Sequence, residues 1–155
     1  MLDIKPYRQK PGFCGPSALK MVLGFYGVEK SEDELGCLTK CDPDKGITGS
    51  AIVKAAGELG FAGFVKDSAE LEDIQKFLDQ KIPVIVEWFS EDDGHYSVVV
   101  EMDKENIYLQ DPELAGLRKF DLETFRRVWF TFGGEFMRTK DDLILRRMVV
   151  IEKKG

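Results

Sequence analysis

The chain has 155 residues, 43% of them apolar, a length at which one domain can bury roughly 70% of the surface of its unfolded chain. Its net charge is −6, with Lys and Arg interspersed among Asp and Glu, so no basic stripe favours nucleic acid as a partner. The polar N-terminus and the short apolar runs predict neither an export signal nor membrane insertion. We therefore expect a stand-alone cytoplasmic domain that comprises residues 1–155.

The first half of the chain is predicted to be mainly helical. Residues 1–13 form an extended arm, because their prolines oppose a helix. A helix is predicted from Cys14 to Tyr26, since apolar residues recur at helical spacing and Gly27 is a typical residue at a helix end. The further predicted elements are a helix from the capping residue Ser31 to Leu38, a helix over 50–59, a strand over 61–65 and a helix from its cap Ser68 to Gln80.

The second half of the chain is predicted to be mainly strands. Residues 83–89 have few polar interruptions, which is typical of a strand in the middle of a sheet. The remaining predicted elements are a hairpin of strands 95–102 and 106–110, a strand over 117–120, a helix over 122–130 and a last strand over 144–152. Helices that precede an antiparallel sheet indicate the α+β class.

Cys14 has the sequence environment of a nucleophile. It follows a loop rich in Gly and Pro and begins the first predicted helix, with Pro16 suited to the first turn. The free N–H groups and the dipole of a helix N-terminus favour a thiolate over a thiol. The alternative interpretation is that Cys14 is a small buried side chain without chemistry.

His95, the one histidine in the chain, opens a predicted strand. An imidazole can take the proton of a thiol and later protonate a leaving amine, so Cys14 and His95 have the residue types of a papain-like pair. Cys37 and Cys41 are four residues apart, but one histidine and no further cysteine leave a zinc site short of ligands. We expect reduced structural thiols there, with no metal and no cofactor.

Three stretches, in this order, resemble the bacteriocin-processing, double-glycine-specific cysteine peptidases of the papain-like clan. They are Gln9 with the CGPSAL run from Cys14, the GHYSVV run around His95, and Asp111 before a proline. The resemblance implies that Gln9 helps to form the oxyanion hole, Cys14 attacks, His95 is the general base and acid, and Asp111 orients His95. It also implies a papain-like fold with N-terminal helices packed on a C-terminal antiparallel sheet.

The activity implied by this resemblance is that of a thiol peptidase, which hydrolyses peptide bonds through a Cys14 acyl-enzyme after small residues such as Gly-Gly. The implied partners are a peptide or protein substrate and a separate transporter. Phe13 stands where family members often have an acidic residue, which affects substrate preference more than chemistry. Residues 46–49 resemble a cleft rim of the family, although a helix N-cap is the favoured interpretation. Two other functions remain open: a thiol acyl transferase, and a non-catalytic peptide-binding regulatory domain.

The position of Asp111 depends on the register of the predicted hairpin. A three-residue loop places Asp111 one diagonal step from His95, whereas a two-residue loop matches the apolar faces better and turns Asp111 away. The triad therefore requires the first register or a bulge near the strand end. Asp92 and Asp93 are alternative orienting residues, and Gln9 has the alternative interpretation of an exposed polar residue in the arm.

Overall fold

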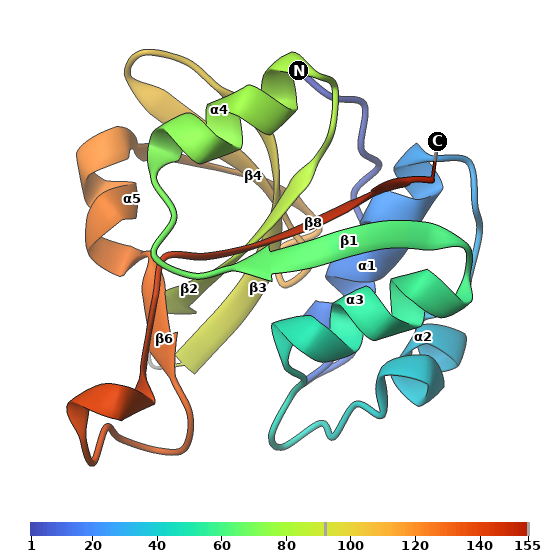
Figure 1. The fold of residues 1–155 in the computed structure, drawn as a ribbon, viewed down its shortest axis with the longest axis horizontal. Helices are drawn as coiled ribbons and strands as arrows, with labels where there is room; N and C mark the ends of the chain where they lie inside the picture. Colours follow the sequence, from blue (N-terminus) through green and yellow to red (C-terminus); the bar gives the residue numbers. More distant parts are fainter. Residues whose placement is uncertain (92, 155) are drawn as a thin grey trace.

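The computed structural model describes residues 1–91 and 93–154, which form a six-stranded sheet with helices on both faces (Figure 1). The strand order in the sheet is β1-β8-β2-β3-β4-β5, and each neighbouring pair is antiparallel. In chain order, the elements are α1 (Cys14–Phe25), α2 (Glu32–Thr39), α3 (Gly49–Glu58), β1 (Phe61–Lys66), α4 (Leu71–Asp79), β2 (Val84–Ser90), β3 (Asp93–Met102), β4 (Asn106–Asp111), β5 (Gly116–Asp121), α5 (Leu122–Val128), β6 (Phe130–Phe132), the 3-10 turn η1 (Lys140–Asp142), β7 (Leu143–Leu145) and β8 (Arg147–Lys153).

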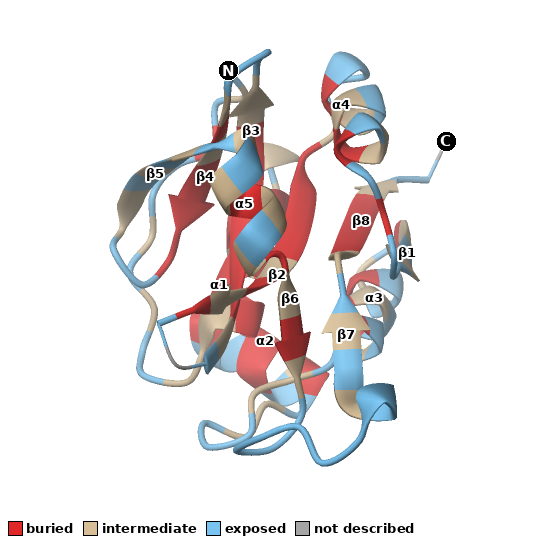
Figure 2. Cartoon of the chain, turned by 90° about the vertical axis from the view of Figure 1, so that its left-hand side faces the viewer, coloured by how far each residue is buried: buried red, intermediate tan, exposed pale blue. Residues whose placement is uncertain are grey.

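The α+β class is confirmed, and the helices divide between the two faces of the sheet. One hydrophobic core lies between the sheet and α1, α2 and α3, and a second lies between the sheet and α4 and α5. Figure 2 shows the buried strands β2, β3 and β8 between these layers, with the outer faces of the helices exposed. Among the described helices, none has the length and apolarity that a crossing of the bilayer requires.

The start of α2 follows its predicted cap, whereas the start of α4 does not. Ser31 and Glu34 form the capping box expected for α2. Ser68 was predicted to cap the next helix, but it has a φ of 55° and its N–H bonds to the carbonyl of Leu145. The N-cap is Glu70, whose N–H donates to Asp73, so the helix begins later than the sequence predicts.

The predicted last strand over 144–152 is two strands, β7 and β8. They are separated at Arg146, which has a φ of 49° and donates its N–H to the carbonyl of Trp129. The break lets β7 pair with β6 as a separate two-stranded ribbon, while β8 enters the main sheet. The ribbon is anchored by Phe89, which stacks on Phe130 with ring centroids 5.2 Å apart.

The N-terminal arm is fixed along β3 and β4 by hydrogen bonds. The Leu2 N–H donates to the Val100 carbonyl at 3.0 Å, and the Gln110 amide donates to the Ile4 carbonyl at 3.0 Å. Ile4 is 3% exposed and belongs to the core under α1. The arm is therefore part of the packed structure, and its course brings Gln9 towards the end of β4.

We expect Ile4→Ala to lower the free energy of unfolding by about 2–5 kcal/mol, because it removes buried methyl groups and leaves a cavity. Lys5→Ala is the matched control in the same arm, since its side chain is 82% exposed. Urea unfolding of the two variants and the wild type measures the difference. Equal midpoints for both variants would contradict a packed arm.

Candidate active site

Cys14 is the first residue of α1, as the sequence predicts. No side chain caps this helix, and no acidic residue of its own lies in its first turn. The thiol is partly buried against the core under α1. Cys14 therefore lies at the positive end of the α1 dipole.

His95 lies in β3 on the sheet face that also carries Trp88. The two residues pair across β2 and β3, and their rings meet edge to face with centroids 5.7 Å apart. The indole N–H of Trp88 donates to Ser97 Oγ at 3.0 Å, which fixes the tryptophan beside the imidazole. His95 is only 6% exposed, so its ring is held by packing rather than by solvent.

A bulge in β3 brings Asp111 to His95. Met102 pairs with Ile107 next to the turn, but beyond the bulge Val99 pairs with Leu109, so the register shifts by one residue. Near the turn, the strands thus have the register of the two-residue loop, which matches the apolar faces. Near the site, they have the register of the three-residue loop, which places Asp111 by His95. The carbonyl of Val100, in the bulge, accepts the hydrogen bond from Leu2 in the arm. The predicted requirement for a bulge is confirmed.

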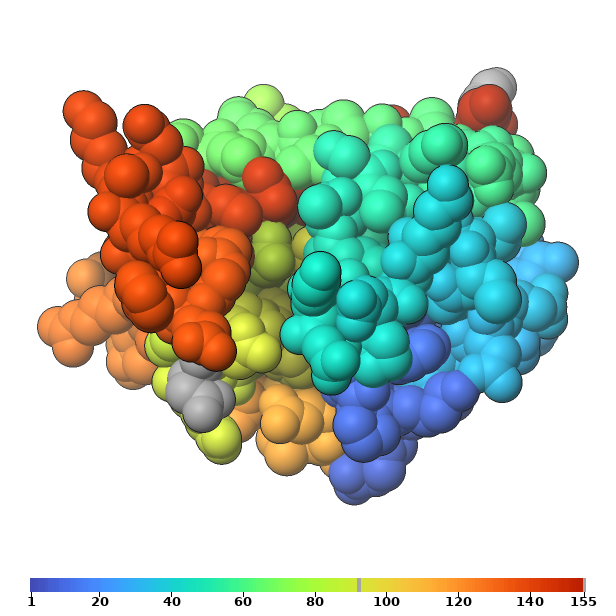
Figure 3. Space-filling view, turned by 90° about the horizontal axis from the view of Figure 1, so that it is seen from below, coloured from blue at the N-terminus to red at the C-terminus, as the bar shows by residue number. Residues whose placement is uncertain are grey.

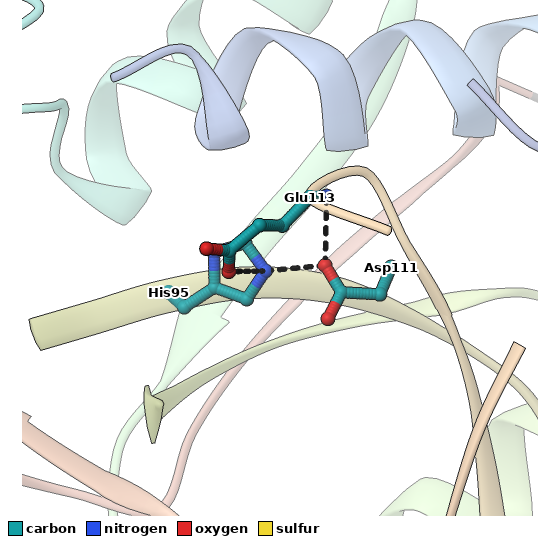
Figure 4. A group of neighbouring side chains, drawn as sticks. All are labelled: His95, Asp111 and Glu113. Carbon is teal, nitrogen blue, oxygen red and sulfur yellow. Dashed lines mark hydrogen bonds and ion pairs between the residues drawn. The ribbon is translucent and has the colours of Figure 1, made fainter. Parts of the chain in front are cut away.

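His95 Nε2 lies 2.5 Å from Asp111 Oδ1, in a buried hydrogen bond (Figure 4). Burial lowers the pKa of His95, but the bond to Asp111 and then the hydrogen bond and charge of Cys14 outweigh it and raise that pKa to about 9. Burial likewise raises the pKa of Asp111, but the hydrogen bond and charge of His95, the Glu113 N–H and the charge of Arg118 together outweigh it, and the pKa of Asp111 is lowered. Since Nε2 is taken by Asp111, Nδ1 is the ring nitrogen left for Cys14.

Two further groups hold the Asp111 carboxylate, and the sequence analysis did not identify them. Arg118 Nη1 lies 3.2 Å from Asp111 Oδ2, and the Arg118 guanidinium lies over the Trp88 ring, 5.2 Å from its centroid. The Glu113 N–H donates to Asp111 Oδ1 at 2.9 Å. Arg118 follows Gly116, the partner of Asp111, by two residues on β5, so strand periodicity alone could have placed it on the same face.

Asp93, one of the two alternative orienting residues, does not replace Asp111. Asp93 is exposed, and its carboxylate accepts the N–H of the adjacent Gly94. Asp92 lies outside the described residues.

Gln9 is half-buried beside the segment that carries Asp111. Its N–H donates to the carbonyl of Pro112 at 2.9 Å, and its side-chain Nε2 donates to the carbonyl of Lys10 at 3.3 Å. Its buried Oε1 has no hydrogen-bond partner among the described residues. Gln9 is thus not the solvent-exposed residue of the alternative interpretation, and its amide is not fully satisfied.

Ile47, in the segment before α3, contacts the residue that follows Cys14 and the residue that follows His95. A Cβ on Gly15 would lie 2.4 Å from Ile47 Cδ1, so the Ile47 side chain sits directly on the residue after Cys14. The hydroxyl of Tyr96, which follows His95, donates to the Ile47 carbonyl at 3.0 Å. Thr48 is also the N-cap of α3, so the favoured interpretation of residues 46–49 is confirmed. In Figure 3 a depression runs between this segment, drawn in teal, and the orange β6–β7 ribbon, above β2 and β3.

The potential ligand groups of the site do not form an open metal centre. His95, Asp111 and Glu113 have ligand atoms within 4.8 Å of one another. The 2.5 Å between His95 Nε2 and Asp111 Oδ1 is a direct hydrogen bond, however, which leaves no space for an ion between them.

All three cysteines are free thiols. Cys37 is exposed, contrary to the expectation of a structural thiol, whereas Cys41 is partly buried and donates to the Gly12 carbonyl at 3.6 Å. Burial is the main cause that raises the pKa of Cys41 to about 11.

Comparison with known proteins identifies the family. The sequence model of the peptidase C39 family matches residues 7–133. The transport/processing ATP-binding protein ComA of Streptococcus pneumoniae is 34% identical over 119 residues, which are 75% of this chain but only 16% of ComA. An uncharacterized protein of Methanothermobacter thermautotrophicus is 37% identical over 117 residues, which are 75% of each chain.

Solved structures show the same fold. The peptidase domain of Streptococcus ComA, a bi-functional ABC transporter of a quorum-sensing pathway, has a TM-score of 0.78 at 23% identity and covers 97% of this chain and 99% of its own. A double glycine motif protease from an AMS/PCAT transporter, solved with its leader peptide, has a TM-score of 0.75 at 20% identity, with 99% and 94% covered. The chain therefore belongs to the peptidase C39 family, the double-glycine type of cysteine peptidase that its sequence resembles.

Proposed function

We propose that the chain cleaves peptides through a Cys14 acyl-enzyme, with His95 as general base and acid and Asp111 as its orienting carboxylate. The observation that carries the proposal is the buried bond between His95 Nε2 and Asp111, which holds the imidazole in one tautomer with Nδ1 free for the thiol. The raised pKa of His95 supports an imidazolium that can stabilise a Cys14 thiolate near neutral pH.

The reaction has two steps. The Cys14 thiolate attacks the scissile carbonyl, and His95 gives its proton to the departing amine, which leaves a thioester on Cys14. His95 then takes a proton from water as the water attacks the thioester, and cleavage of the C–S bond releases the acid product and restores the Cys14 thiolate beside the His95 imidazolium. The Gln9 amide and the Cys14 N–H are the proposed donors to the oxyanion in both steps.

The substrate is proposed to be a peptide with small residues, such as Gly-Gly, before the cut. The Ile47 side chain covers Gly15, the residue after the nucleophile. The hydrogen bond from Tyr96 to the Ile47 carbonyl holds the segment before α3 against β3 at this point. A substrate that enters this side of the site has little room for side chains. Because relatives such as ComA are transport and processing proteins, we also propose that a transporter exports the cleaved peptide.

We expect iodoacetamide at pH 6 to alkylate Cys14 well before Cys37, although Cys37 is exposed, because only Cys14 has a helix N-terminus and an imidazolium partner. Mass spectrometry of digested protein after timed exposure measures the two rates. His95→Ala should abolish the difference. Equal rates in the wild type would count against an activated thiol.

The alkaline limb of kcat/KM should report His95. Its pKa is raised to about 9, so the imidazolium is present below that pH and is lost as the pH rises through it. Asp111→Asn removes the charge that raises this pKa, and the limb should move to lower pH. Glu113→Gln is the control, since its exposed carboxylate lies 3.8 Å from His95 Nε2 and should have a small effect. An unmoved limb in Asp111→Asn would show that another group sets it.

A matched pair of peptides tests the substrate. We expect a peptide with Gly-Gly before the cut to have a kcat/KM at least about tenfold above an otherwise identical Leu-Leu peptide, which is about 1.4 kcal/mol in the barrier. Cys14→Ala should cleave neither. Comparable values in the wild type would reject the double-glycine preference, and no acyl-enzyme with either peptide would favour a non-catalytic binding domain.

A further inference from the structure

Glu32 is a buried carboxylate outside the Cys–His–Asp constellation. Among the described residues, it and Asp111 are the two acidic residues that are buried, and Glu32 is 5% exposed. The charge of Asp111 is compensated by His95 and Arg118. Glu32 has no such ion pair: the neighbouring Lys10 ammonium binds Asp33 instead. A buried carboxylate is costly unless its oxygens accept hydrogen bonds.

The hydrogen bonds of Glu32 join two segments of the proposed active site. One oxygen, Oε2, accepts the backbone N–H of Lys10 at 2.9 Å and the hydroxyl of Ser17 at 2.6 Å. Lys10 directly follows Gln9 in the arm, whereas Ser17 is fully buried in the first turn of α1. A single atom on α2 therefore fixes the arm to the helix that begins with Cys14.

The Gln9 backbone is held from both sides. Its own N–H donates to the Pro112 carbonyl at 2.9 Å, and the next N–H, that of Lys10, donates to Glu32. The Lys10 carbonyl in turn accepts the Gln9 side chain at 3.3 Å and the Phe13 N–H at 3.0 Å. Without Glu32, the backbone after Gln9 would lose the hydrogen bond that ties it towards α1. The hydrogen bond from the Gln9 N–H to Pro112, next to β4, would remain.

We propose that Glu32 is a positioning residue that sets the Gln9 amide against the Cys14 N–H, so that the two donors meet at one oxyanion. The proposal rests on the proposed function, in which both groups stabilise the tetrahedral intermediate. A displacement of one donor by about 1 Å is enough to cost a large factor in rate. Glu32 acts through Gln9 and does not touch the substrate.

A role limited to the stability of α2 leads to different expectations. Glu34 lies in the same first turn and forms the capping box with Ser31, but it bonds neither Lys10 nor Ser17. Glu34→Ala is therefore a matched control that removes a helix-stabilising contact and leaves the arm in place. If Glu32 only stabilises the helix, the two variants should behave alike.

The test is a double-mutant cycle on hydrolysis of a quenched Gly-Gly peptide. We expect Glu32→Ala to lower kcat by about tenfold with KM within about twofold of the wild type, the pattern of an interaction realised in the transition state. In a Gln9→Ala background, the same change should lower kcat by less than about twofold, because the donor that it positions is gone. Glu34→Ala should leave kcat near the wild-type value, and Cys14 alkylation should be unchanged in all variants.

Two conservative variants separate reach from charge and carry the test if Glu32→Ala does not fold. Glu32→Gln keeps the length and an acceptor oxygen, so kcat should be largely restored. Glu32→Asp keeps the charge but retracts the acceptor from Lys10, so kcat should fall as in Glu32→Ala. An equal loss in the Gln9→Ala background, or a rise in KM alone, would overturn the positioning role. A Gln9→Ala enzyme with full kcat would instead reject the proposed oxyanion hole itself.

Discussion

One irregular step in the pairing of β3 with β4 determines whether the site exists. Without it, the apolar residues beside the turn would match and Asp111 would face away from His95. The bulge at Val100 allows both the apolar match and the contact between Asp111 and His95, because the register changes between the turn and the site. The N-terminal arm takes part in this, since Leu2 bonds the carbonyl of the bulged residue. The arm thus contributes to the geometry of the His95–Asp111 pair in two ways: Leu2 bonds the bulge, and the Gln9 N–H bonds the carbonyl of Pro112, the residue after Asp111.

The site keeps its charges in a region that packing has largely closed to water. Burial opposes an imidazolium at His95 and a carboxylate at Asp111, and the two groups are charged there because each compensates the other. Arg118 supplies a further positive charge behind the carboxylate, 3.2 Å from Oδ2, and the Trp88 ring covers its guanidinium. Removal of any one of these groups leaves a buried neighbour without its compensation.

The sequence predicted the elements whose signals are local. The helix at Cys14, the capping box at Ser31 and the hairpin behind His95 have their causes within a few residues, and all three are confirmed. The break at Arg146 depends instead on a hydrogen bond to the Trp129 carbonyl, and the shifted start of α4 depends on the hydrogen bond from Ser68 to the Leu145 carbonyl, neither of which has a local pattern. Glu32 was missed because its bonding partners, Lys10 and Ser17, are distant in the sequence. Arg118 was missed although strand periodicity places it on the face of Asp111, because a charged side chain on a strand is most often solvated.

The position of Trp88 allows its fluorescence to report the protonation state of His95. Its indole is 2% exposed, meets the His95 ring edge to face and is fixed by its bond to Ser97, so solvent does not determine its emission. A protonated imidazole quenches a neighbouring indole more strongly than a neutral one. The other tryptophan, Trp129, is buried in the core beside α5 and bonds the Arg147 carbonyl. The chain therefore carries an intrinsic fluorophore in contact with its histidine, through which the protonation of that ring can be followed without substrate and without turnover.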